Sequence, residues 1–359
     1  MRILAFARYG PQAASTRQRL LQYIPHLNAT GIEVEYHPLL PDAYVQGLAT
    51  GEPYPRWRVA RDYVRRAGQL LGKRHYDLVW VYADLFPYLP AFAERLVLGS
   101  GKPVVYDLDD AFFHHYGESP NPVVRRLLEG KFAELLSRAA ACGCGNSYVR
   151  DYAASYCRNS FILPTVVDTS IYVPLARRSS AEPIVIGWIG SPTTWPNVRP
   201  LLPLLAQLCA EKNVRVRVVG AGRSAEQDHF PGLDLVEWSE AAEVAEVQRM
   251  DIGIMPLVDR PFERGKSGYK LIQYMACGLP VVASPVGVNN EIVVEGENGL
   301  LATSVEEWRH ALTRLILDPD LRSQMGTAGR KKAETSYSLT SQVPRLVQLF
   351  RTVSMEDRQ

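Results

Sequence analysis

The chain alternates short β-branched, apolar runs with stretches of helical periodicity, and it does so twice along its length. Such alternation is typical of parallel sheets whose strands are joined by crossover helices. The apolar runs of the second half, such as Asp251–Pro256 and Pro280–Ser284, are almost uninterrupted, which indicates strands covered on both faces. The sequence therefore predicts an α/β protein with two Rossmann-like, doubly wound parallel sheets.

The two halves are separated by residues 164–183, where a stretch rich in Pro, Ser and Thr interrupts the alternation. We expect an N-terminal domain over 1–165, a linker over 166–183, a C-terminal domain over 184–338, and a last helix within 339–359 that packs back on the N-terminal domain. The strands expected in the N-terminal domain are Arg2–Ala7, Ile32–Pro38, Asp77–Tyr82, Pro103–Tyr106, Ala141–Gly145 and Ser160–Leu163. Those expected in the C-terminal domain are Ile184–Gly190, Val214–Val219, Leu233–Trp238, Asp251–Pro256 and Pro280–Ser284.

The composition narrows the class of partner. The 359 residues include 40 Lys and Arg against 38 Asp and Glu, so the formal net charge is only +2 and nucleic acid is not an expected partner. The sequence has no apolar run long enough for a membrane span and no visible secretion signal, and its five cysteines match no zinc spacing. We expect a cytoplasmic protein that holds no metal ion.

A glycine-containing loop opens one helix of the second half. Gly265 and Gly268 leave backbone N–H groups uncovered at the helix N-terminus, where the helix dipole favours an anion. Lys266 and Lys270 are four residues apart, so they lie on one side of this turn. The sequence predicts a diphosphate seat here, with a merely solvated, lysine-bearing helix start as the alternative.

The segment that follows reads YMACGLPVVA over residues 274–283. It is similar to the donor-binding signature of glycosyltransferase family 4, whose members are retaining enzymes of GT-B architecture, with two Rossmann-like domains facing a central cleft. Segments 8–20, 104–113, 185–190 and 291–302 also resemble that family. The resemblance implies a hexosyltransferase that takes a UDP- or GDP-sugar as donor and uses no cofactor. Its acceptor would be a hydroxyl of a glycan or of a lipid-linked intermediate in surface polysaccharide or glycolipid synthesis.

The resemblance places the donor site in the C-terminal domain. The family's two glutamates fall here on Gly265 and Gln273, so this chain departs from the pattern. We expect Gln273 to hydrogen-bond a ribose hydroxyl, and Glu263 to supply the missing catalytic carboxylate. The donor-binding residues predicted in this way are Gly190, Ser191, Gly265, Lys266, Ser267, Gly268, Tyr269, Lys270 and Gln273.

In the N-terminal domain, Asp109 and Asp110 stand where the family usually carries a His-Asp pair. We expect them to be catalytic, either by accepting the proton of the acceptor hydroxyl or by orienting the acceptor. One alternative is a helix-cap and turn cluster at a strand end. The other is a metal-binding Asp-x-Asp pair formed by Asp107 and Asp109, as in the other large glycosyltransferase fold.

Two arginines lie near the start of a helix expected over residues 15–29, with Ser15 as its N-cap. Arg17 sits in the first turn and is predicted to contact the donor phosphates or the acceptor. Arg19 points elsewhere and is expected to serve solubility only.

Residues 56–74 hold seven basic residues and one acidic residue. Five apolar residues fall at helical spacing within this segment and form one stripe. Two interpretations are open: the helix makes peripheral contact with an anionic membrane, or the stripe packs on the protein's own sheet and leaves the arginines in water. The residues of the stripe are Trp57, Ala60, Val64, Ala67 and Leu71.

The sequence leaves three other functions open. Val219–Ala225 imitates the G-x-G-x-x-G/A fingerprint of NAD(P)-dependent oxidoreductases, although only a short helix has room to follow it. A nucleotide-sugar-processing enzyme of the same fold, such as an epimerase or a phosphorylase, would need the same donor site. Because the family's glutamates are missing, a non-catalytic nucleotide-binding protein is the third alternative.

Overall fold

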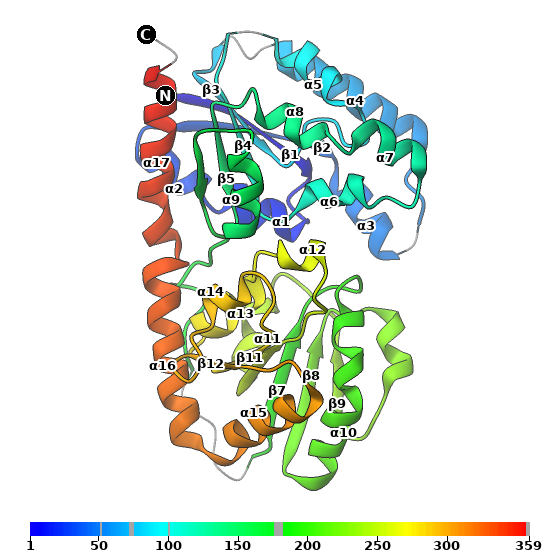
Figure 1. Ribbon diagram of the computed structural model, residues 1–359, viewed down its shortest axis with the longest axis vertical. Helices are drawn as coiled ribbons and strands as arrows, with labels where there is room; N and C mark the ends of the chain where they lie inside the picture. Colours follow the sequence, from blue (N-terminus) through cyan, green and yellow to red (C-terminus); the bar gives the residue numbers. More distant parts are fainter. Residues whose placement is uncertain (51, 72–74, 100, 176–181, 357–359) are drawn as a thin grey trace. The chain divides into compact units, whose positions relative to one another are not determined.

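The computed structural model describes residues 1–50, 52–71, 75–99, 101–175 and 182–356, and the chain forms two compact units (Figure 1). Unit 1 comprises Met1–Val166, Arg264–Ser267 and Leu339–Gln359, and unit 2 comprises Val167–Glu263 and Gly268–Ser338. Each unit contains one six-stranded sheet. Of the predicted linker, residues 176–181 lie outside the described residues.

The sheet of unit 1 has the strand order β2-β1-β3-β4-β5-β6, and every neighbouring pair is parallel. Because β2 lies on one side of β1 and β3 on the other, the strand order reverses between β1 and β3. The strands are β1 Arg2–Tyr9, β2 Glu33–Leu40, β3 Leu78–Tyr82, β4 Val104–Leu108, β5 Ala141–Cys144 and β6 Ser160–Ile162.

Helices cover the apolar sheet of unit 1, as expected for buried parallel strands. The last helix, α17 (Leu339–Glu356), lies beside α2 and packs on the sheet, where Phe350 meets Trp80 with ring centroids 5.1 Å apart (Figure 1). The other helices of unit 1 are α1 Ala14–Thr16, α2 Ile24–Ala29, α3 Asp42–Thr50, α4 Arg56–Leu71, α5 Ala91–Leu98, α6 Phe112–Gly117, α7 Pro122–Leu128, α8 Lys131–Leu136 and α9 Ser147–Ala154.

The sheet of unit 2 is also parallel, with the order β12-β11-β10-β7-β8-β9. Its order reverses between β7 and β10, which is where doubly wound sheets bind their ligands. The strands are β7 Ile184–Ile189, β8 Val214–Val219, β9 Leu233–Val236, β10 Ile252–Met255, β11 Val281–Ala283 and β12 Gly299–Leu301. The helices include α10 Leu202–Glu211, α11 Glu243–Gln248, α12 Pro261–Arg264, α13 Tyr269–Ala276, α14 Asn289–Ile292, α15 Val305–Leu317 and α16 Pro319–Ser336.

The prediction of two Rossmann-like parallel sheets is confirmed. Eleven strands were expected and each lies where a strand is found, whereas β12 was not expected. With three residues, of which Gly299 has no side chain, β12 is too short to show an apolar pattern. Its place at the edge of the sheet comes from pairing with β11.

The helix expected over residues 15–29 is interrupted. The chain forms α1, then a π-helical turn over Arg17–Leu21, then α2, and the N-cap is Ala13 instead of Ser15. A π turn holds an extra residue, so the positions after it are rotated around the helix axis. Arg19 is therefore fully buried, and the prediction that it serves solubility only is wrong.

Arg19 instead links β4 to the segment that directly follows β6. Its Nε donates to Asp107 Oδ1 at 3.0 Å and its Nη1 donates to the Leu163 carbonyl at 2.9 Å. Asp107 is also buried and lies in β4. A carboxylate in such an apolar setting depends on its cationic partner, because its charge has lost the solvation that water provides.

We expect Arg19→Leu to lower the free energy of unfolding by about 3–5 kcal/mol, because the buried carboxyl of Asp107 would lose its cationic partner. Urea unfolding followed by circular dichroism measures this effect. The matched control is Arg17→Leu, since Arg17 is less buried and bonds two loop carbonyls; it should cost about 1 kcal/mol. Equal losses in the two variants would contradict a special role for the buried pair.

The apolar stripe predicted in residues 56–74 does not pack on the sheet. In α4, the Trp57, Val64 and Leu71 side chains are 62%, 73% and 80% exposed, whereas Arg66 is fully buried. The second interpretation of this segment is therefore wrong in its packing: α4 buries Asp62, Arg66 and Leu70, and of the stripe only Ala67 packs against the core. The other arginines of the helix are exposed, as that interpretation expected. Residues 72–74 lie outside the described part of the chain.

Candidate functional site

The loops after β7 and β10 meet at the point where the strand order of unit 2 reverses. The backbone N–H of Val258 donates to Asn197 Oδ1 at 3.2 Å and ties the two loops together. Gly190 directly follows β7 and packs tightly: a Cβ on it would lie 2.4 Å from Trp188 Cζ2 and 2.9 Å from Lys270 Cε. The absence of a side chain at Gly190 is thus what lets Lys270 reach the end of β7.

Lys270 holds a positive charge at this edge of the sheet. Its Nζ lies 5.6 Å from the centroid of the Trp188 ring, which is 2% exposed. An aromatic face attracts a cation through the ring quadrupole, so the indole helps to fix the ammonium group. Lys270 is the second residue of α13, so it belongs to the first turn, where the positive end of the helix dipole lies.

Gly268 sets the direction in which α13 begins. It is the N-cap residue and has φ +68°, a left-handed backbone conformation that residues other than glycine rarely adopt. A Cβ there would lie 2.3 Å from Ile292 Cδ1. Both the backbone conformation and the packing therefore require glycine at the start of this helix.

Gln273 lies at the centre of a buried polar cluster. It is 2% exposed, and its Nε2 donates to Glu243 Oε1 at 2.8 Å and to the Tyr172 hydroxyl at 2.9 Å. The indole Nε1 of Trp238 donates to the other oxygen of Glu243 at 2.7 Å. Glu243 and Tyr172 are not among the residues predicted from the sequence, because they come from distant segments. The role of Gln273 toward a ribose stays a prediction.

Three further residues predicted from the sequence belong to unit 2: Ser191, Tyr269 and Glu263. Ser191 opens a hydroxyl-bearing turn in which its Oγ lies 2.9 Å from Thr193 Oγ1 and its N–H donates to Thr194 Oγ1 at 3.1 Å. Tyr269 is the first residue of α13 and packs against the core. Glu263 lies in α12 and is half-buried, and its catalytic role stays a prediction.

In unit 1, Asp109 and Asp110 directly follow β4. Asp109 is 6% exposed and accepts a hydrogen bond of 2.8 Å from the Tyr82 hydroxyl. Burial and the neighbouring carboxylate of Asp110 raise the pKa of Asp109 to about 7. Neither aspartate caps a helix, since α6 has Ala111 as its N-cap and no side-chain cap.

The loop Arg264–Ser267 belongs to unit 1, together with three of the predicted donor residues. The N–H of Ser267 donates to Asp110 Oδ1 at 3.0 Å, and Lys266 Nζ lies 3.7 Å from Asp110 Oδ2. Asn146 Nδ2 donates to the carbonyls of Gly265 and Lys266 at 3.0 and 2.9 Å. The two lysines of the predicted seat therefore belong to different units, and Lys266 pairs with a carboxylate.

Arg17 stabilises the loop after β1. Its Nη1 donates to the carbonyls of Pro11 and Gln12, both at 2.9 Å. No described contact tests its predicted role toward phosphate or acceptor, which stays a prediction.

Three charged residues that were not predicted from the sequence, Arg8, Asp84 and Lys131, meet where the strand order of unit 1 reverses. Arg8, near the end of β1, lies 2.8 Å from Asp84, which follows β3, and Lys131 Nζ lies 2.8 Å from the other oxygen of Asp84. Burial raises the pKa of Asp84, but Arg8 and Lys131 lower it by more than burial raises it. The pKa therefore lies below its ordinary value, and the carboxyl stays ionised. Ala83, with φ +61°, turns the chain so that Asp84 enters this group. An aspartate two residues after an apolar strand was the available signal in the sequence.

Cations also surround His115 in unit 1. Burial, then Arg8 and Lys266, lower the pKa of His115. The edge that carries Asp109 and Asp110 therefore also carries positive charge.

Two alternative readings of the sequence find no support. Asp107 is bound to Arg19 in the core, and within the described residues no group of His, Cys, Asp and Glu is arranged to hold a metal ion. The G-x-G-x-x-G/A look-alike continues into a 3-10 helix, Arg223–Asp228, instead of an α-helix. A Cβ on Gly222 would lie 2.7 Å from Pro192 Cγ, so this glycine serves loop packing.

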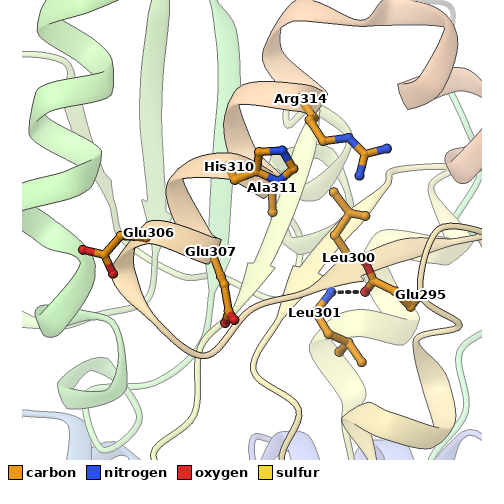
Figure 2. A pocket seen from close by; sticks show the side chains of 8 residues that line it. All are labelled: Glu295, Leu300, Leu301, Glu306, Glu307, His310, Ala311 and Arg314. Carbon is orange, nitrogen blue, oxygen red and sulfur yellow. Dashed lines mark hydrogen bonds between the residues drawn. The ribbon is translucent and has the colours of Figure 1, made fainter.

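A cavity of about 360 Å³ lies elsewhere in unit 2, between β12 and the start of α15 (Figure 2). Figure 2 shows His310 and Arg314 on α15 above Leu300. Two of its carboxylates are already used: Glu295 accepts from the Leu301 N–H, and Glu307 accepts from two N–H groups at the start of α15. None of the predicted donor residues lines this cavity.

Comparison with known proteins relates the site of unit 2 to a family. Residues 183–318 match the family model of the glycosyl transferases group 1. This segment is similar to that family. Within it lie Gly190, Lys270 and Gln273, so the matched segment contains the switch point described above.

Individual proteins also resemble parts of the chain. A D-inositol 3-phosphate glycosyltransferase of Pseudarthrobacter chlorophenolicus is 29% identical over 150 residues, which are 39% of this chain and 32% of that protein. The chain thus spans about a third of the length of this curated relative.

Solved structures resemble nearly the whole chain. Sucrose-phosphate synthase from Thermosynechococcus elongatus aligns with a TM-score of 0.73 at 17% identity, over 98% of each chain. Anabaena Alr3699/HepE in complex with UDP-glucose aligns with a TM-score of 0.72 at 16% identity, over 98% of this chain and 100% of that one. At such identities the likeness shows the fold, which is GT-B.

We expect Gly268→Ala to destabilise unit 2 by roughly 2–4 kcal/mol, because the new Cβ adds a steric overlap to an unfavourable φ. The matched control is Gly296→Ala, where φ is +79° but no atom lies within 4 Å of the added Cβ. That variant should lose only about 1 kcal/mol. Urea unfolding of both variants measures the difference, and equal losses would show that the packing against Ile292 does not matter.

The raised pKa of Asp109 predicts a dependence of stability on pH. The folded chain keeps a proton on Asp109 that the unfolded chain, with the ordinary pKa of 3.8, releases. The stabilising contribution is therefore fully present below about pH 4 and is lost as the pH rises through about 7. We expect Asp109→Asn to flatten the fall in the urea midpoint between pH 5 and pH 8.

A second variant gives the direction of the effect. Tyr82 donates a hydrogen bond that lowers the pKa of Asp109, so Tyr82→Phe should move the loss of stability to higher pH. An unchanged pH profile in both variants would show that another group titrates.

Proposed function

We propose that this chain is a retaining hexosyltransferase that moves a sugar from a UDP- or GDP-sugar to a hydroxyl acceptor. The observation that carries the proposal is the position of Lys270, whose ammonium group is held over Trp188 beside Gly190. When the bond to the sugar breaks, negative charge develops on the leaving diphosphate. A preorganised cation at the N-terminal end of α13 stabilises that charge.

A nucleotide diphosphate-sugar fits the surroundings of Lys270. The group 1 match covers this part of the chain, and the Anabaena protein of similar fold was solved with UDP-glucose. The turn at Ser191 contributes hydroxyl groups but no cation, so Lys270 supplies the positive charge at this edge. We propose that neither a metal ion nor a cofactor takes part.

On the acceptor side, we assign the chemistry to Asp109 and Asp110. A carboxyl with a pKa of about 7 is able to take up the proton of a hydroxyl at neutral pH. Asp110, fixed by the N–H of Ser267, orients the acceptor. Retention and the class of acceptor, a glycan or a lipid-linked intermediate, follow from the resemblance to glycosyltransferase family 4, and Glu263 is proposed in place of that family's first glutamate.

One observation favours a second candidate, a nucleotide-binding protein without catalysis. The family's second glutamate is replaced by Gln273, and the amide nitrogen of Gln273 is already bonded to Glu243 and Tyr172. Hydrolysis of a bound UDP- or GDP-sugar, or transfer of its sugar to any hydroxyl compound, would exclude this candidate.

We expect UDP and GDP, and their sugars, to raise the melting temperature of the protein, whereas NAD(P) does not. Lys270→Ala should raise the Kd for these nucleotides at least about tenfold, because it removes a charge-assisted contact to the diphosphate. Thermal shift and isothermal titration measure the two effects. Lys331→Ala, on the exposed side of α16, is the matched control and should bind like the wild type. If Lys270→Ala keeps its full affinity, the phosphate assignment is wrong.

A further inference from the structure

The outward face of α4 carries a row of large apolar side chains, although the helix belongs to a folded unit. Trp57, Val64 and Leu71 are seven residues apart, so in a helix of 3.6 residues per turn they fall along one line. All three are more than half exposed. Large apolar side chains in such a continuous row, about 20 Å long, mark an interaction surface.

The opposite side of α4 explains why the helix cannot turn this row inward. Asp62, Arg66 and Leu70 are buried. Arg66 donates to the carbonyl of Ala7 at 2.8 Å and to that of His37 at 3.1 Å, and these residues lie in β1 and β2. Removing these bonds would leave buried polar groups without partners, which is costly. The apolar row is thus presented by a fixed helix.

Arginines flank the apolar row. The guanidinium groups of Arg58 and Arg61 lie 5.2 and 5.8 Å from the centroid of the Trp57 ring. Arg56 and Arg65 are also exposed. The single acidic residue of α4, Asp62, is buried, and its carboxylate lies 3.3 Å from Arg61 and 3.1 Å from Arg65. The accessible charge of this helix face is therefore positive.

We propose that this face of α4 docks on the surface of a bilayer that contains anionic lipids. An interfacial helix places apolar and Trp side chains at the boundary of headgroups and acyl chains while its arginines meet lipid phosphates. A nucleic acid would satisfy the arginines, but it offers no apolar environment to Val64 and Leu71. No helix in the described residues is long and apolar enough to cross a bilayer, so the contact is peripheral.

The test is sedimentation of the full chain with vesicles of equal parts phosphatidylglycerol and phosphatidylcholine, and with vesicles of phosphatidylcholine alone. We expect binding to the anionic vesicles at low salt, with weaker binding at high salt because ions screen the arginines. Arg56→Gln/Arg58→Gln should weaken binding roughly 30-fold, and Trp57→Ser/Val64→Ser at least about tenfold.

Two controls match these variants on exposed sites elsewhere. Arg158→Gln/Lys331→Gln removes the same charge, and Leu317→Ser removes an apolar side chain that is 66% exposed on α15. Both should bind like the wild type. Melting temperatures of all variants should stay near that of the wild type, since the changed side chains are exposed.

Fluorescence reports which residue enters the interface. Trp80, Trp188, Trp195 and Trp308 are at most 2% exposed, and Trp238 is half-buried. A blue shift on adding anionic vesicles should therefore come from Trp57 and vanish in Trp57→Phe, whereas a shift that persists in this variant would come from Trp238. Equal binding to neutral vesicles, or no loss in either α4 variant, would overturn the proposal. So would a wild type that ignores vesicles but forms dimers that Arg56→Gln/Arg58→Gln dissociates, because the face would then belong to a second copy of the chain. None of these outcomes depends on the proposed sugar transfer.

Discussion

The parallel course of the strands determines where the loops that carry the candidate site residues lie in each unit. In a parallel sheet the carboxyl ends of all strands lie at one edge, and the loops that follow them collect there. In unit 2 this brings Gly190, after β7, next to Lys270, although the two are 80 positions apart in the sequence. The strand order reverses between β7 and β10, and the candidate donor site lies at that edge of the sheet.

Unit 1 uses the same edge in a different way. Arg8, Asp84 and Lys131 form a buried charged group at its switch point, and Asp109 follows β4, the strand next to β3. Buried charges are tolerated when each has a partner, and each partner comes from a different element. These groups thus fix the loops after β1 and β3 relative to the strands. The same arrangement places a positively charged environment beside two carboxylates.

Gln273 and Gly265, which depart from the pattern of the resembling family, fit their surroundings in this structure. Gln273 takes a position where the resembling family carries glutamate, and in this chain it bonds Glu243 and Tyr172. A neutral amide beside Glu243 avoids the repulsion that a second carboxylate would meet there. Gly265 packs against Ala111, where a Cβ would lie 2.2 Å from its methyl carbon. Both substitutions are therefore consistent with their local packing.

The sequence by itself determined the fold class, because the period of its apolar pattern distinguishes strands from helices and the alternation of the two requires parallel sheets. It also located the turn at Gly268 and the lysine that follows, since glycine and charge at a helix start have a local physical meaning. It could not determine which face of α4 is buried, because Arg66 reaches carbonyls of β1 and β2 that are distant in sequence. Nor could it place Arg19 in the core or find Glu243 and Asp84, because a π turn and the pairing of buried charges arise only when distant segments pack together.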